Sequence, residues 1–206
     1  MSARGRKRAD GGVTEVAEHE FYPTPAPAID AMITSRIVTL PGGRWLDPCA
    51  GAGAIPNVTN GHRSDIAWDL VDIDYRHVSA LRMVDRVTSI TTADFLALAL
   101  DPALDGRLWD VAIFNPPFSR ALEFVVHCRR LASVTVMLQR LNWIGPARAA
   151  WLRANQPDVY ALPKRPSFTG DGNTDAAEYA WFVWDERAPS QRFGRVAMLD
   201  EARSNT

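Results

Sequence analysis

The sequence contains few residues that bind metal ions, since it has only two cysteines and four histidines among its 206 residues. Cys49 and Cys128 lie far apart and form no Cys-x-x-Cys pair, and the histidines form no cluster at a metal-ligand spacing. A structural zinc site needs four such ligands, usually paired at short intervals. We therefore expect no metal site.

Long apolar runs are also absent. A membrane-spanning helix needs about 18 or more consecutive apolar residues, and no such run occurs. The basic residues near the start are not followed by the apolar segment that a signal peptide requires. These absences favour a cytoplasmic protein with no membrane partner.

The formal net charge is only −1 at pH 7, but the charge is unevenly distributed. Residues 2–8 read SARGRKR and contain no large apolar side chain. This composition predicts a disordered basic tail over 1–18, which is either simply solvated or touches a polyanion. With 47% hydrophobic residues the chain can bury one sizeable core, so we expect a single domain over 19–199 and a second disordered tail over 200–206.

Short apolar runs alternate with segments long enough for crossover helices, which is typical of a mostly parallel sheet covered on both faces. The expected strands are 44–47, 66–73, 87–92, 109–114, 133–139 and 178–184, with 194–199 as either a last edge strand or an irregular segment. The expected helices are 26–38, 75–84, 120–132 and a short one within 142–157. The Pro, Gly and Asp content of 162–178 indicates a long loop. The pattern predicts a doubly wound α/β fold.

A glycine-containing loop follows the first expected strand. The stretch RWLDPCAGAGAIP places Asp47 at the strand end and Gly51 and Gly53 just after it. Glycines there let a ligand approach the backbone closely, which suggests a nucleotide-like ligand. Pro56 stands where a dinucleotide fingerprint needs its third glycine, so that motif is not present.

Acidic residues follow the next two expected strands. Asp72 is suited to accept hydrogen bonds from the two hydroxyls of a ribose, with Asp74 as the alternative. Asp94 is suited to accept from an adenine amino group, and Phe95 to pack on the ring. A helix cap would explain any one of these acids alone. Their order at successive strand ends favours a ligand site, because ligands of such sheets bind at the carboxyl ends of the strands.

The stretch VAIFNPPFSR carries a strand into two prolines. Pro116 and Pro117 lack a backbone N–H, so the strand must end there. Proline also restricts the preceding residue to extended conformations, which would hold the carbonyl groups of Asn115 and Pro116 in fixed positions. The loop therefore either merely stops the strand or also holds a rigid polar edge for chemistry.

Taken together, LDPCAGAG, VDID, ADFL and FNPPF resemble S-adenosylmethionine-dependent methyltransferases of the amino-methylating type, which have a class I, Rossmann-like fold with a seven-stranded sheet. The resemblance covers most of residues 21–118 and implies S-adenosyl-L-methionine as cofactor. It assigns Asn115, Pro116, Pro117 and Phe118 to the catalytic loop. The cofactor-binding residues that it implies are Tyr22, Thr24, Pro25, Asp47, Pro48, Gly51, Gly53, Asp72, Asp94 and Phe95.

The stretch YPTP, just before the first expected helix, resembles the N-terminal motif of adenine-N6 DNA methyltransferases, where it helps to hold the methionine end of the cofactor. This implies N6-adenine methylation of DNA by a compact enzyme of the phage or prophage type, acting on a base flipped out of the duplex. Phe118 would lie against that base. The stretch RPSF resembles a segment that packs an aromatic ring on the flipped base, which implies substrate roles for Phe168 and Arg165.

Two alternative functions remain open from the sequence. Relatives with NPPF or NPPY loops also methylate structured RNA, and a non-catalytic nucleotide- or nucleic-acid-binding domain would keep the same fold. No separate recognition domain fits after Phe118, which leaves low sequence specificity, a partner, or recognition by the segment 142–172. Several cations on expected surface segments are either phosphate contacts or simply solvated: Arg120, Arg140, Arg148, Arg153 and Lys164. The sequence does not predict an oligomeric state.

Overall fold

The computed structural model describes residues 23–98, 108–168, 176–187 and 194–201. Tyr22, the expected tail 1–18 and residues 202–206 lie outside these ranges. The strands of the described part are β1 (Gly43–Asp47), β2 (Ile66–Asp72), β3 (Val87–Thr92), β4 (Trp109–Phe114), β5 (Ala132–Arg140), β6 (Asp158–Ala161), β7 (Tyr179–Asp185) and β8 (Val196–Met198). Its α-helices are α1 (Ala26–Ile33), α2 (Ala54–Asn60), α3 (Val78–Leu81), α4 (Ala121–Leu131) and α5 (Ala149–Ala154).

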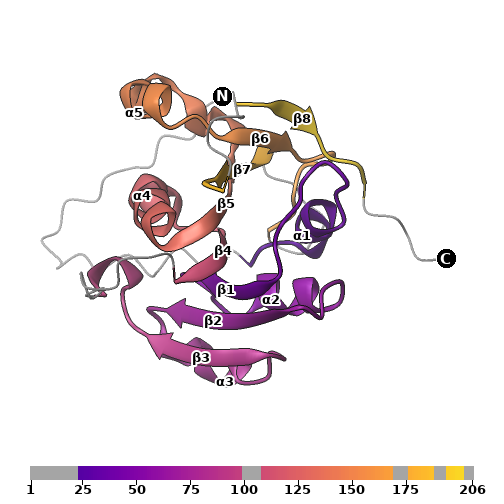
Figure 1. The fold of residues 1–206 in the computed structure, drawn as a ribbon, viewed down its shortest axis with the longest axis vertical. Helices are drawn as coiled ribbons and strands as arrows, with labels where there is room; N and C mark the ends of the chain where they lie inside the picture. The colour runs from indigo at the N-terminus through magenta and orange to yellow at the C-terminus, as the bar shows by residue number, and fades with distance from the viewer. Residues whose placement is uncertain (1–22, 99–107, 169–175, 188–193, 202–206) are drawn as a thin grey trace, which may run out of the picture.

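The strands form one mixed sheet in the order β3-β2-β1-β4-β5-β7-β6-β8 (Figure 1). Strands β3, β2, β1, β4 and β5 are parallel to one another, whereas β7 runs antiparallel to both β5 and β6. The chain builds the sheet outward from β1 to β3 and then returns to place β4 on the other side of β1. This reversal creates a crevice at the carboxyl ends of β1 and β4, where doubly wound sheets bind their ligands.

Helices cover both faces of the sheet, as the sequence pattern predicted (Figure 1). Helices α1, α2 and α3 contribute Ile29, Ile55 and Leu81 to one hydrophobic core, and α4 contributes Phe124 and Cys128 to the other. The central strand β4 is buried over Val111 to Phe114 because it is covered from both sides. One domain with the expected doubly wound α/β architecture results.

One strand, β6, lies in a segment to which the sequence assigned no element. It pairs antiparallel with β7 in the register Asp158 to Val183 and Ala161 to Ala180. The strand is only four residues long, too short to produce a readable period, and it forms because β7 offers a partner. Strand β8 forms where the sequence left open a last edge strand or an irregular segment, and the described sheet has eight strands where the resemblance implied seven.

Two expected helices are shorter in the structure. Helix α1 ends at Ile33 rather than at residue 38, with Thr34 as its C-cap. The expected helix 75–84 consists of a 3₁₀ turn, η1 (Tyr75–His77), followed by the single turn of α3.

Within the described ranges, no helix has the length and apolar character needed to cross a membrane. The same residues contain no group of three or more His, Cys, Asp or Glu side chains arranged to hold a metal ion.

Candidate functional site

A cavity of about 530 Å³ lies at the crevice beside β1, β2, β3 and β4. Its volume is within the range of small-molecule sites. Many of the sequence-predicted site residues line it, although they come from five separate segments of the chain. These residues are Thr24, Asp47, Pro48, Gly51, Asp72, Asp94, Phe95, Asn115 and Pro117.

The loop after β1 forms one wall of this cavity. Asp47 ends β1 and is 1% exposed, and its Oδ1 accepts a hydrogen bond from the Cys49 N–H at 3.2 Å. Burial raises the pKa of the Asp47 carboxyl well above its usual value, and the nearby charge of Asp72 raises it further, while the Cys49 N–H opposes this shift. A buried carboxyl of this kind is suited to meet a positively charged ligand group, which would favour its ionised form.

The two glycines of this loop have different roles. Gly51 has φ 51° and lines the cavity, so its backbone is open to a ligand. Gly53 has φ 84° and precedes α2, and a Cβ atom there would lie 2.8 Å from a Val84 methyl carbon. It does not line the cavity, so the absence of a side chain there serves helix packing rather than the ligand approach that the sequence suggested.

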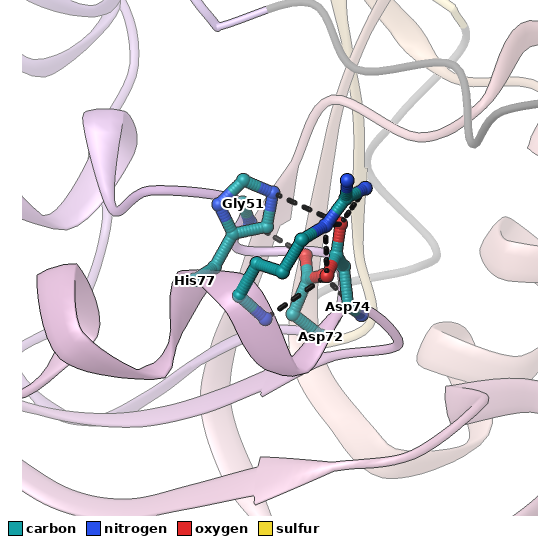
Figure 2. Close-up of polar contacts among 5 residues, drawn as sticks. Gly51, Asp72, Asp74 and His77 are labelled. Carbon is teal, nitrogen blue, oxygen red and sulfur yellow. Dashed lines mark hydrogen bonds and ion pairs between the residues drawn. The ribbon is translucent and has the colours of Figure 1, made fainter.

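Asp72 connects the loops that follow β1 and β2. Its Oδ2 accepts from the Gly51 N–H at 2.6 Å, and its Oδ1 accepts from the Asp74 N–H at 2.8 Å (Figure 2). Each carboxylate oxygen has a second lone pair, so the side chain can still accept hydrogen bonds from a ligand. The two backbone donors hold the carboxylate in a defined orientation at the cavity wall.

The carboxylate of Asp74, the alternative ribose acid, is bound by side chains that follow it in the sequence. Arg76 binds it through Nε at 2.8 Å and Nη2 at 2.5 Å, and Nε2 of His77 lies 3.9 Å from its Oδ2 (Figure 2). Hydrogen bonds from the Arg76 side chain and backbone lower the pKa of Asp74 well below its usual range. Protein donors therefore occupy the Asp74 carboxylate more fully than the Asp72 carboxylate.

The segment after β3 presents Asp94 and Phe95. Asp94 caps the 3₁₀ turn η2 (Phe95–Ala97), because its Oδ1 accepts from the Leu96 N–H at 3.0 Å. Phe95 is 2% exposed and packs against Phe124 and His127, with ring centroids 5.8 and 4.9 Å away. It is thus a core residue that also forms part of the cavity wall.

The loop after β4 brings two of the four predicted catalytic residues to the same cavity. Asn115 and Pro117 line it, whereas Pro116 is buried and Phe118 does not line it. The Cys49 thiol donates to the Asn115 carbonyl oxygen at 3.5 Å, which joins this loop to the loop after β1. Phe118 begins the 3₁₀ turn η3 (Phe118–Arg120).

Phe118 belongs to an aromatic cluster next to the cavity. The guanidinium carbon of Arg140 lies 4.8 Å from the centre of its ring, and Tyr179 lies 6.1 Å away between ring centroids. Tyr179 also packs on Phe168 at 5.1 Å, and its hydroxyl accepts from Nε of Arg140 at 3.1 Å. Phe118 and Phe168 thus contact the same residue, Tyr179, which the sequence did not single out.

A second cavity, of about 590 Å³, lies between the start of α1 and residues 162–167. Pro25 and Arg165 line this second cavity, so they do not share the first one with Thr24. Arg165 forms an ion pair with Glu178, with its Nε 2.7 Å from Oε1. Neither residue therefore lines the first cavity, although Pro25 is itself one of the predicted cofactor-binding residues.

Several predicted phosphate contacts have protein partners. Arg148 donates to the Trp143 carbonyl oxygen at 3.2 Å, and Lys164 pairs with Glu201 at 2.8 Å. Arg140 lies over Phe118, as described above. Arg153 is exposed. Lys164 is exposed as well, whereas Arg120, Arg140 and Arg148 are half-buried.

No protein-family model matches this sequence, and no curated protein matches it. Solved structures do resemble the fold. A type I restriction-modification methyltransferase subunit from Streptococcus thermophilus matches with a TM-score of 0.61 and 16% identity over 81% of this chain, which spans 45% of that subunit. A presumed RNA methyltransferase from Pyrococcus horikoshii matches with a TM-score of 0.61 and 15% identity over 81% of this chain and 86% of its own.

A third solved structure, the 23S rRNA methyltransferase ErmE, matches with a TM-score of 0.58 and 14% identity over 85% of this chain and 73% of its own. Identities this low establish the fold and nothing finer. The chain therefore has the mixed α/β fold, with a large and mostly parallel sheet flanked by helices, that is found in these methyltransferases.

Proposed function

We propose that this protein is a methyltransferase that uses S-adenosylmethionine to methylate the exocyclic N6 amine of adenine in DNA. One observation carries this proposal. The acid and glycine residues at the ends of β1, β2 and β3 share a single cavity with Asn115 at the end of β4. A cofactor bound against the first set would lie within reach of an amine held by the second.

The cavity fits the proposed cofactor in chemistry as well as in size. Asp72 is oriented to accept from the ribose hydroxyls, and the Gly51 backbone permits close approach. Thr24 is 7% exposed and lines the same cavity, where it would contact the methionine end. Asp47 provides a buried acid for the positively charged part. When bound, S-adenosylmethionine would supply a methyl group on a sulfonium, ready for transfer to a nucleophile.

The residues after β4 would activate the amine. The lone pair of an exocyclic amine is delocalised into the base, so the free amine is a poor nucleophile. If the side-chain carbonyl of Asn115 and the backbone carbonyl of Pro116 each accept one amine hydrogen, the lone pair is directed toward the methyl group. Fixed acceptors also stabilise the positive charge that develops on nitrogen. A neutral amine needs no general base for its attack.

Phe118 would support the base from beside this loop. Its ring is held by Arg140 and Tyr179, and Phe168 extends the aromatic cluster. A base inside a duplex cannot reach such a position, so the target must be flipped out or already single-stranded. Arg165 lines the second cavity and is a candidate contact to the nucleic acid around the target.

The choice of DNA rests on the YPTP stretch, of which Pro23, Thr24 and Pro25 are described. Structured RNA is the second candidate, since two of the structural neighbours are named as RNA methyltransferases. The test is incubation with methyl-labelled S-adenosylmethionine and either unmethylated DNA or ribosomal RNA, followed by nucleoside digestion and mass spectrometry. N6-methyladenine in the DNA supports the proposal, whereas label in RNA or in protein alone contradicts it.

The Asn115→Ala variant separates an enzyme from a binding domain that has lost turnover. We expect it to abolish methyl transfer, because one of the two amine acceptors is removed, and to change the calorimetric affinity for S-adenosylhomocysteine by less than about threefold. Loss of both would assign Asn115 a structural role. A wild-type chain that binds the cofactor but transfers no methyl group to any nucleic acid would be a binding domain.

A further inference from the structure

Arg120 contacts two of the segments that line the first cavity, the one after β3 and the one after β4. It ends the turn η3, and its backbone N–H donates to the Pro117 carbonyl oxygen at 3.0 Å. Its side chain lines the cavity, and Nη1 donates to Oδ2 of Asp94 at 3.1 Å. A single residue therefore contacts both the segment of Asn115 to Phe118 and the acid expected to bind adenine.

The carboxylate of Asp94 is shared between these partners. Its Oδ1 accepts from the Leu96 N–H, and its Oδ2 accepts from Arg120. An adenine amino group that donates to Asp94 would use the remaining lone pairs of the same carboxylate. The bound adenosine and the guanidinium of Arg120 would then be held by one side chain, so each would restrict the position of the other.

The ion pair between Arg120 and Asp94 contributes little to folding. The two side chains are 42% and 32% exposed, and ion pairs this accessible to water add little stability because solvent screens them. Arg120 also pairs with Glu123, whose side chain is 61% exposed and lies outside the cavity wall. Neither ion pair of Arg120 is therefore expected to add much to the free energy of unfolding.

We infer that Arg120 is a positioning residue that couples occupation of the adenosine end of the cavity to the conformation of residues 115–118, so that cofactor binding strengthens nucleic-acid binding. This inference rests on the proposed function. Coupling between two ligands is reciprocal, so the nucleic acid strengthens cofactor binding by the same factor.

The experiment measures this coupling directly with the full chain. The Kd for an adenine-containing oligonucleotide is determined by fluorescence anisotropy without and with saturating S-adenosylhomocysteine. For the wild type we expect the product cofactor to tighten oligonucleotide binding about fivefold or more. For Arg120→Gln we expect a change of less than about twofold, because the amide cannot form the charged pair with Asp94.

Two matched variants control for charge and for local structure. Glu123→Gln removes the other partner of Arg120 and should keep the wild-type coupling. Arg120→Lys retains the charge and should restore part of it, since a lysine reaches one carboxylate but lacks the fork that binds two. All three variants should unfold within about 2 °C of the wild type, as expected for exposed ion pairs.

The inference is overturned if Arg120→Gln keeps the wild-type coupling, if Glu123→Gln loses it equally, or if the wild type shows none. Failure of the proposed function is recognised separately, because it appears in the wild type as an absence of methyl transfer or of cofactor binding. An active wild type with an unchanged Arg120→Gln variant would contradict the coupling alone.

Discussion

The thiol of Cys49 lies 3.5 Å from the carbonyl oxygen of Asn115 and donates a hydrogen bond to it. Residues 66 positions apart are thereby joined, and so are the loops that follow β1 and β4. Both residues line the first cavity. A ligand in that cavity would consequently lie against the contact through which one loop supports the other.

The first prediction concerns the reactivity of this thiol. Burial raises the pKa of Cys49, and the charges of Asp47 and Asp72 raise it further, so little thiolate is present at pH 8. We expect slow reaction with a disulfide reagent such as DTNB and still slower reaction with bound S-adenosylhomocysteine. In Cys49→Ala, only the fully buried Cys128 remains, and the cofactor-dependent phase should disappear. A phase that persists in this variant would assign the protection to Cys128.

The second prediction concerns the ribose acceptor. Asp72→Asn keeps the size of the side chain but loses its charge, and a charge-assisted hydrogen bond contributes about 2 kcal/mol. We expect the calorimetric Kd for S-adenosylhomocysteine to rise about 30-fold. Asp74→Asn is the matched control and should change the Kd much less, because Arg76 already binds the Asp74 carboxylate. A larger effect of Asp74→Asn than of Asp72→Asn would transfer the ribose role to Asp74.

The third prediction concerns pH and stability. Folding raises the pKa of Asp47 above the unfolded value of about 3.9, so the folded state favours the protonated carboxyl. Below about pH 3.9 the carboxyl is protonated in both states, and its full contribution to the free energy of unfolding is present. This contribution is lost as the pH rises through the folded-state pKa, because the unfolded state releases the proton first. Asp47→Asn cannot ionise. We therefore expect its Tm to exceed that of the wild type by an amount that grows between pH 4 and pH 8.

Asp74 should have the opposite effect on how stability depends on pH. Hydrogen bonds from Arg76 lower its pKa in the folded state, so its contribution is present at neutral pH and is lost as the pH falls below about 3.9. Asp74→Asn should therefore lower the Tm at pH 7 and have a diminishing effect under acid conditions. Calorimetric scans of both variants across this range check the two signs, and a lower Tm of Asp47→Asn at pH 8 would mean that Asp47 is stabilised as the carboxylate.

The fourth prediction concerns the support of Phe118. Tyr179→Phe removes only the hydroxyl that accepts from Nε of Arg140 and leaves the ring contacts in place. Loss of this hydrogen bond costs about 1 kcal/mol, so we expect kcat to fall about fivefold, with an unchanged affinity for S-adenosylhomocysteine. Steady-state kinetics of Tyr179→Phe, Arg140→Gln and the double variant test this. Because the two residues act on Phe118 together, their effects should be less than additive, and full additivity would refute the shared role.

Most of the architecture could be predicted from the sequence, because parallel central strands are buried on both faces and appear as continuous apolar runs. Strands β1, β2, β3, β4, β5 and β7 lie within about two residues of their expected positions. Strand β6 was missed because its four residues depend on pairing with β7 rather than on a pattern of their own. The ends of α1 and α3 differed for a similar reason, since helix ends follow tertiary packing as much as local preference.

The sequence by itself determined which segments end at the cavity, since the carboxyl ends of parallel strands necessarily meet at one edge of the sheet. Asp47, Asp72, Asp94 and Asn115 came together for that reason. Only the tertiary structure decided how their side chains are paired. The contacts of Arg120 with Asp94, across 26 positions, and of Arg140 with Tyr179, across 39, depend on strand register and on the turn after the two prolines. Such distant contacts leave no local period, so the residues that support the candidate site become visible only once the chain has folded.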